Sequence, residues 1–221
     1  MSGKIFECGY GAIVMEDVEV LEACLEKLCS PGAIVRICEI GAHDGGTALG
    51  IKRYVESHGA TLEYWGLEPD IHRVPFIWPG GTLIQEDSAT AWAKVPVELD
   101  LVWVDGCHCK NHVIMDTVNF SPKVRNFGFI LYHDINPHIQ GVGEKQPCGP
   151  VDVPEFNVFV NGALEAIRWP WGAWELFRES YPLDQWGCGT RAYRKGRAMK
   201  LVPEVDQFGE DKFLTLRKVE A

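Results

Sequence analysis

The sequence contains no apolar run long enough to cross a membrane and no excess of basic residues. A membrane span requires about 18 uninterrupted apolar residues, and no stretch of the 221 residues approaches that length. Lys and Arg number 21 against 31 Asp and Glu, which gives a formal net charge of −10 at pH 7. A general binder of nucleic acids or of anionic membranes needs a surplus of cations. The composition therefore argues against both classes of partner.

The first residues also lack the apolar core of a secretion signal. The segment from Met1 to Cys8 reads Met-Ser-Gly-Lys-Ile-Phe-Glu-Cys, which favours a cytoplasmic protein. The eight cysteines do not indicate a disulfide framework, because Cys24, Cys29 and Cys38 lie in apolar segments where a reduced thiol packs as a small hydrophobic group. The cysteines and histidines of residues 107–112 lack the paired-cysteine spacing of a structural zinc site.

Alternating strand and helix patterns predict an α/β protein. Leu21, Leu25 and Leu28 belong to one apolar stripe, which predicts an N-terminal helix over residues 16–29. Nearly continuous apolar runs follow and are separated by further helical segments, as in a parallel sheet that is buried on both faces. The expected strands are 33–40, 62–67, 82–85, 99–104 and 127–132, and the helices between them include 46–58 and 109–120.

The last third of the sequence carries two further strands and one long connection. Residues 174–178 and 190–193 read as paired strands, which completes a doubly wound, seven-stranded, mainly parallel sheet with an antiparallel terminal strand. Residues 135–151 are rich in Gly and Pro and have the length of an active-site lid or substrate loop. Residues 196–221 form a C-terminal tail with weak periodicity.

Acidic residues recur where the expected strands end. They are Glu39, Glu68, Asp87, Asp105 and Asp134. In an open α/β sheet the ligand crevice lies beyond the carboxyl ends of the strands. Five carboxylates at one edge of the sheet are more than we expect by chance for acidic residues on a solvent-exposed surface. We therefore expect a ligand site at this edge of the sheet, in a single domain over residues 1–221. The sequence does not determine the oligomeric state, and a homo-oligomer is possible.

The turn after the first expected strand is rich in glycine. It reads Glu39-Ile-Gly41-Ala-His43-Asp-Gly45-Gly46-Thr. Glycines let the backbone approach a ligand closely, but a dinucleotide site would show G-x-G-x-x-G, and here His43 stands at the second glycine position. Glu39 would repel a pyrophosphate and attract a sulfonium or amino group. The turn favours a cationic, adenosine-bearing ligand over a nicotinamide dinucleotide.

In this turn the chain resembles the first motif of class I S-adenosylmethionine-dependent methyltransferases. Further matches to that family are Glu68, in Trp-Gly-Leu-Glu68-Pro-Asp, and the Glu-Asp87-Ser88 segment. The resemblance implies a Rossmann-like methyltransferase fold that binds S-adenosylmethionine. It places Glu39, Gly41 and Gly45 at the methionine end of the cofactor, Glu68 on the ribose hydroxyls, and Asp87 and Ser88 around the adenine. Ala42 and His43, in the same turn, are further candidates for contact with the cofactor.

Two later segments resemble a narrower subfamily. Asp105-Gly-Cys-His108 and the pair His133-Asp134 are similar to small-molecule O-methyltransferases with an Asp-Gly-x-His motif, macrolide-sugar enzymes among them. Asp105 and Asp134 end adjacent strands and would repel each other without a cation between them. Mg²⁺ suits such oxygen ligands, with His133 as third ligand or Asn136 in its place. The resemblance makes His108 the general base, with His133 as the alternative.

The sequence thus predicts metal-assisted methylation of a small-molecule hydroxyl, with Asp105, His108 and His133 as the catalytic residues. Two other functions stay open. A metal-independent methyltransferase acting on nitrogen or on a protein would be insensitive to a chelator. A catalytically silent partner protein would bind the cofactor without turnover.

Overall fold

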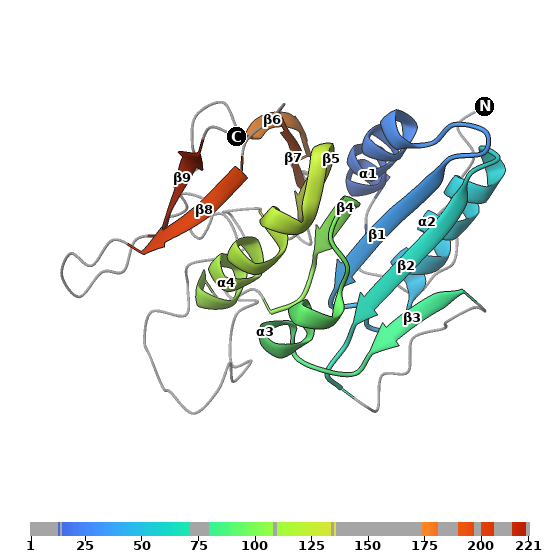
Figure 1. Cartoon of the computed structure of the whole chain (residues 1–221). Coiled ribbons are helices and arrows are strands. Elements are labelled where there is room, and N and C mark those ends of the chain that lie inside the picture. The colour runs from blue at the N-terminus through green and yellow to red at the C-terminus, as the bar shows by residue number, and fades with distance from the viewer. Residues whose placement is uncertain are drawn as a thin grey trace.

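A computed structural model describes residues 13, 15–70, 80–107, 110–133, 135, 174–180, 190–196, 200–205 and 214–219. From α1 to the fifth strand, helices and strands alternate along the described residues except between β2 and β3 (Figure 1). The elements are α1 Met15–Leu28, β1 Ile34–Ile40, α2 Gly46–Ser57, β2 Thr61–Leu67, β3 Gly81–Ile84, α3 Ser88–Ala91, η1 Trp92–Lys94, β4 Leu99–Val104, α4 Lys110–Phe120, η2 Ser121–Lys123, β5 Val124–Tyr132, β6 Trp174–Glu179, β7 Arg191–Lys195, β8 Lys200–Val205 and β9 Leu214–Val219.

Seven of these strands form one sheet in the order β3-β2-β1-β4-β5-β7-β6. Strands β1 to β5 pair in parallel, and β7 is antiparallel to both of its neighbours, β5 and β6. The predicted seven-stranded, mainly parallel sheet is confirmed. The antiparallel strand β7 is the last of these seven strands in sequence, but it lies inside the sheet, with β6 at the edge. The strand order reverses between β1 and β4, and such a switch point is where open α/β sheets bind ligands.

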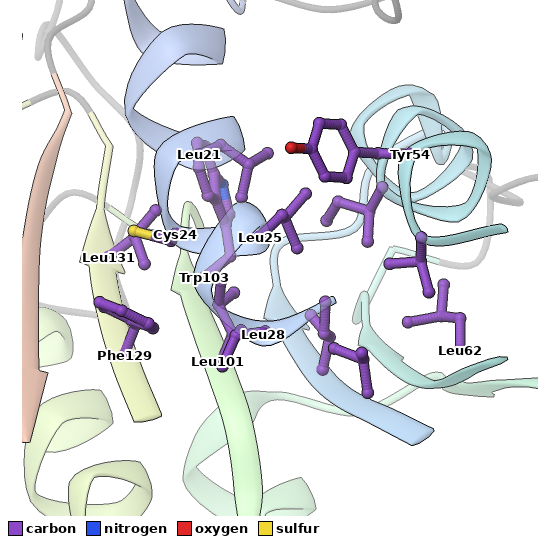
Figure 2. Packing of buried hydrophobic residues seen from close by; sticks show 14 of the residues in the cluster. Leu21, Cys24, Leu25, Leu28, Tyr54, Leu62, Leu101, Trp103, Phe129 and Leu131 are labelled. Atoms are coloured by element: carbon purple, nitrogen blue, oxygen red, sulfur yellow. The ribbon is translucent and has the colours of Figure 1, made fainter. Parts of the chain in front are cut away.

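The sheet is covered by helices on both faces because its strands are apolar on both sides. Along β4, alternate side chains such as Trp103 and Val104 enter two different core clusters. The Trp103 cluster contains residues of α1 and α2, and the Val104 cluster contains residues of α3 and α4. Figure 2 shows Leu21, Cys24 and Leu25 of α1 pointing onto the first of these faces. This double covering makes the strand ends, rather than the sheet faces, the accessible part of the sheet.

Two expectations from the sequence need correction. Strand β5 begins at Val124 instead of residue 127, because the β4–β5 pairing shifts register and Phe127 adopts a φ of 65°, which interrupts the apolar pattern. The tail is not featureless, because β8 and β9 pair antiparallel in a separate two-stranded sheet. Pro203 within β8 lowers the strand signal of that segment.

Other expectations fall outside the part of the chain that the structure describes. His108, Asp134 and all of the 135–151 connection except Ile135 are among them. Of the helices that the structure does describe, none combines the length and apolarity that a membrane crossing requires.

Candidate active site

The backbone gathers the strand-end residues at one edge of the sheet. Parallel pairing continues one residue beyond the strands: Gly41 N donates to Leu67 O at 2.9 Å and Asp105 N donates to Ile40 O at 2.9 Å. In the same way, His133 N donates to Val104 O at 3.0 Å and Glu68 N donates to Ile84 O at 3.2 Å. The ends of β1, β2, β4 and β5 therefore hold their functional candidates in one row.

The glycine-rich turn packs directly against the loop that follows β4. Gly41 has a φ of +86°, and a Cβ on it would lie 2.2 Å from the backbone oxygen of Asp105, so only glycine fits there. Gly45, with a φ of 82°, precedes α2. His43 also adopts a left-handed conformation, with a φ of 46°, which matches its place at a motif glycine. Ala42 is buried beside it and donates from its backbone N to Leu67 O at 3.0 Å.

Glu39 is buried inside this turn and is bound by hydroxyl groups. The Tyr64 hydroxyl donates to its Oε2, and the Thr47 side chain also hydrogen-bonds to it. Burial raises the pKa of Glu39 to about 8, although both hydrogen bonds work in the opposite direction. A buried carboxyl of this kind ionises readily only when a cation comes close, which suits the ammonium or sulfonium of a ligand.

Glu68 connects the end of β2 to the glycine-rich turn. Its Oε2 accepts from His43 N at 2.9 Å, and its Oε1 accepts from Asp70 N at 3.0 Å. The residue is 6% exposed. Each carboxylate oxygen can accept more than one hydrogen bond, so both oxygens retain acceptor capacity for ligand hydroxyls.

Asp87 and Ser88 begin α3 beyond the end of β3. Asp87 caps that helix by accepting from Ala89 N at 2.8 Å. Behind Ser88 lies Asp116 of α4, a carboxyl that is 1% exposed and that hydrogen-bonds to the Ser88 side chain. Burial raises the pKa of Asp116 to about 7. The capping role that Asp87 performs in the fold is compatible with a ligand contact through its other oxygen.

Two of the remaining candidates, Asp105 and His133, lie in one chain of side-chain contacts with Asp17. His133 Nδ1 lies 3.0 Å from Asp105 Oδ1, and His133 Nε2 lies 3.2 Å from Asp17 Oδ2. His133 is 1% exposed, whereas Asp105 is an intermediate, partly accessible residue. To coordinate a metal, His133 would have to give up one of these two contacts. No cluster of three or more His, Cys, Asp or Glu with the arrangement of a metal site occurs among the described residues.

Among the partners in this site that were missed at the sequence level are Asp17, Tyr64 and Ser180, whose Oγ donates to Asp17 Oδ1 at 2.6 Å. Asp17 offered a signal, because it is in helical register with the apolar residues Leu21 and Cys24 and so places a carboxylate on the buried face of α1. Tyr64 and Ser180 gave none, since a tyrosine in a strand and a serine after one are ordinary residues there.

Comparison with protein families gives one match. Residues 38–135 match the model of a methyltransferase domain family. This segment runs from β1 to the residue after Asp134 and includes the glycine-rich turn, Glu68, Asp87 and Asp105. No curated protein matches the sequence.

Comparison with solved structures shows the fold. Cofactor-bound Rv0187 from MTB superposes with a TM-score of 0.60 at 14% identity, covering 87% of this chain and 84% of that one. An O-methyltransferase structure from Klebsiella pneumoniae gives 0.59 at 15% identity, with 83% and 81% covered. MycE methyltransferase of mycinamycin biosynthesis, solved with Mg, SAH and mycinamycin VI, gives 0.57 at 19% identity. That match covers 87% of this chain, which spans about half (52%) of MycE. The chain has the Rossmann-like methyltransferase fold.

Proposed function

We propose that the chain is an S-adenosylmethionine-dependent methyltransferase that methylates a hydroxyl group of a small molecule with the assistance of a divalent cation. The matched methyltransferase domain and the fold support the methyltransferase part of this proposal. The O-methyltransferases among the structural neighbours support a small hydroxyl acceptor. The complex of MycE with Mg and SAH supports the cation.

In this proposal the glycine-rich turn and the ends of β2 and β3 bind the cofactor. Glu39, with Gly41, Ala42, His43 and Gly45, holds the methionine end. Glu68 accepts from the two ribose hydroxyls, and Asp87 and Ser88 contact the adenine. Ionising Glu39 beside a cationic ligand compensates for the burial of its carboxyl group.

The reaction itself is an in-line displacement. The acceptor oxygen forms a bond to the methyl carbon while the carbon–sulfur bond breaks, and the electron pair of that bond stays on sulfur, which leaves S-adenosylhomocysteine. The hydroxyl proton goes to a base, for which His108 is our candidate, with His133 as the alternative. The protein contributes proximity and electrostatic support for the developing alkoxide.

A cation would be held by the carboxylates of Asp105 and Asp134. Among the described residues, Asp105 fits this role, because its carboxylate is partly exposed at the sheet edge and offers oxygen. A bound Mg²⁺ would supply positive charge next to the acceptor oxygen. His133, as third ligand, would require a rearrangement of its two carboxylate contacts.

One observation carries the proposal: the cofactor turn and the loop of Asp105 are in direct contact. The Cα of Gly41 approaches the Asp105 backbone so closely that a side chain cannot be placed between them. Methyl donor and acceptor must come within about 3–3.5 Å of each other. The direct contact between the glycine-rich turn and the acidic loop supports the proposal, because the two candidate binding regions adjoin each other.

Calorimetric titration with S-adenosylhomocysteine, with and without Mg²⁺, tests the assignment. Glu68→Ala should weaken binding by about 1.5–3 kcal/mol, because it removes hydrogen bonds to a charged acceptor. Glu63→Ala is the matched control, since Glu63 lies in β2, the strand that Glu68 follows, and pairs with Arg36 on the surface. Equal affinity of a folded Glu68→Ala protein and the wild type would contradict the ribose assignment. Methyl transfer at an unchanged rate after rigorous demetallation would favour a metal-independent enzyme.

A further inference from the structure

Tyr64 places a buried hydroxyl group next to the glycine-rich turn. The residue lies on β2 with 2% of its surface exposed, and its hydroxyl donates to Oε2 of Glu39, which is 1% exposed near the end of β1. A phenylalanine would fill the same space in the core. The hydroxyl therefore calls for an explanation of its own, because a buried donor is present only where a partner needs it.

The sequence keeps space open for this hydroxyl. Gly66 lies two residues after Tyr64 on the same face of β2 and is opposite Glu39 in the pairing of β1 with β2. A Cβ on Gly66 would lie 3.0 Å from the Tyr64 hydroxyl, 3.0 Å from a carbon of its ring and 3.0 Å from the Ala42 Cβ. The Tyr64 ring therefore extends past Gly66 to the glycine-rich turn, and a larger residue in place of Gly66 would crowd it.

The carboxyl group that Tyr64 holds is short of positive charge. The charges that act on Glu39 from the described part of the chain are negative and come from Asp105 and Asp44. Its hydrogen bonds come from two hydroxyl groups, those of Tyr64 and Thr47. An ionised carboxylate has about four acceptor positions, so positions remain for further donors. Because an ionised carboxylate is costly to bury without a cation, a cationic ligand with donors of its own fits this group.

The unused acceptor positions favour an ammonium group over a sulfonium as that ligand. An ammonium carries N–H donors as well as charge, whereas a sulfonium carries charge alone. Hydrogen bonds between a charged donor and a carboxylate are among the strongest in proteins. Burial and the neighbouring Glu39 raise the pKa of Tyr64 well above its usual range. The Tyr64 hydroxyl therefore keeps its proton and donates to Glu39 whether that carboxyl group is neutral or ionised.

We propose that Tyr64 is a positioning residue, which orients the Glu39 carboxylate toward the ammonium group at the methionine end of the cofactor. The inference rests on the proposed function, in which Glu39 holds that end, and it adds a residue that acts without touching the ligand. It does not depend on the cation. Losing a hydrogen bond to a charged acceptor weakens an interaction about tenfold or more, which sets the size of the expected effect.

The test compares two ligands by calorimetric titration. S-adenosylhomocysteine carries the ammonium group, whereas methylthioadenosine has the same adenosine and a thioether but no amino acid. Tyr64→Phe keeps the ring and removes the hydroxyl. It should weaken S-adenosylhomocysteine binding about tenfold and leave methylthioadenosine binding within about twofold, because the contacts of the adenosine lie outside the Tyr64–Glu39 pair. A purely structural role of the hydroxyl would affect both ligands alike.

Tyr132→Phe is the matched control. Tyr132 is a fully buried tyrosine of the core cluster on the other face of the sheet, and its hydroxyl lies 2.8 Å from Thr117 Oγ1. The substitution removes a buried hydroxyl of the same kind away from Glu39. It should leave the ratio of the two ligand affinities within about twofold of the wild-type ratio.

A double-mutant cycle checks that Tyr64 acts through Glu39. In Glu39→Gln, which already lacks the carboxylate, adding Tyr64→Phe should change S-adenosylhomocysteine affinity by no more than about twofold. Three results would overturn the positioning role: unchanged S-adenosylhomocysteine affinity in Tyr64→Phe, an equal loss for both ligands, or a loss of the same size in the Glu39→Gln background. A wild type that binds neither ligand would instead overturn the cofactor assignment of the proposed function.

Discussion

Replacing Glu39 with Gln should make the unliganded protein more stable while weakening its hold on the cofactor. The folded-state pKa of Glu39 is raised from 4.5 to about 8 by burial. Below pH 4.5 the carboxyl is protonated in both folded and unfolded chains. As the pH rises, the unfolded carboxyl ionises first, so this group lowers stability progressively until the folded carboxyl also ionises near pH 8.

The size of the effect follows from the shift. Each pKa unit corresponds to about 1.4 kcal/mol, so the wild type should lose about 3 kcal/mol from Glu39 between pH 4.5 and pH 7. Glutamine has no such titration. It can still accept from Tyr64 and can donate its amide to Thr47, the two hydroxyl partners of the carboxyl.

Urea unfolding at a series of pH values measures this difference. The stability advantage of Glu39→Gln over the wild type should grow from pH 5 to pH 8, whereas Glu63→Gln, on the exposed Arg36 pair, should differ little from the wild type at any pH. Titration with S-adenosylmethionine should show weaker binding to Glu39→Gln. Parallel stability curves for Glu39→Gln and wild type would refute the reasoning, because they would mean that the carboxyl titrates normally in the fold.

Two further substitutions test the site from other sides. Gly41→Ala should destabilise the fold by about 2 kcal/mol or more and abolish S-adenosylhomocysteine binding. The control is Gly32→Ala, at a similar φ of +80° but with nothing within 4 Å of the new Cβ, which should cost only the backbone strain of about 1 kcal/mol. Equal losses of stability in urea unfolding would contradict the predicted clash at Gly41. Burial raises the folded-state pKa of Asp116 from 3.8 to about 7. Asp116→Asn should therefore be more stable than the wild type, by a difference in unfolding free energy that grows between about pH 4 and pH 7. Above that range the difference should level off at no more than about 4 kcal/mol. Thermal unfolding across that range measures the margin, and a constant difference would count against the raised pKa.

The fold was predictable because its signals are local. A parallel strand buried on both faces is a short apolar run, as in Leu99–Val104, and its end is marked by an acid or a glycine. The same logic placed Glu39, Glu68 and Asp105 at one edge, since all parallel strands end on the same side.

The partners of these residues depend on contacts between distant segments. Asp17 and His133 are 116 positions apart, and Asp17 and Ser180 are 163 apart. No periodicity within one element reveals which serine meets which carboxylate. The raised pKa of Glu39 has the same origin, because it depends on burial by neighbouring elements rather than on the residues next to it.

The position of β7 between β5 and β6 has a consequence for synthesis on the ribosome. The partner of β5 on one side, β4, precedes it along the chain, but its other edge is completed only by β7, about 60 residues later. Translation proceeds at about 5–20 residues per second. The apolar end of β5, Phe129–Tyr132, therefore has one unpaired edge for several seconds. Open apolar edges recruit other chains. Nascent chains that end before β7 should therefore depend on chaperones or aggregate, even though the segment from β1 to β5 is already present.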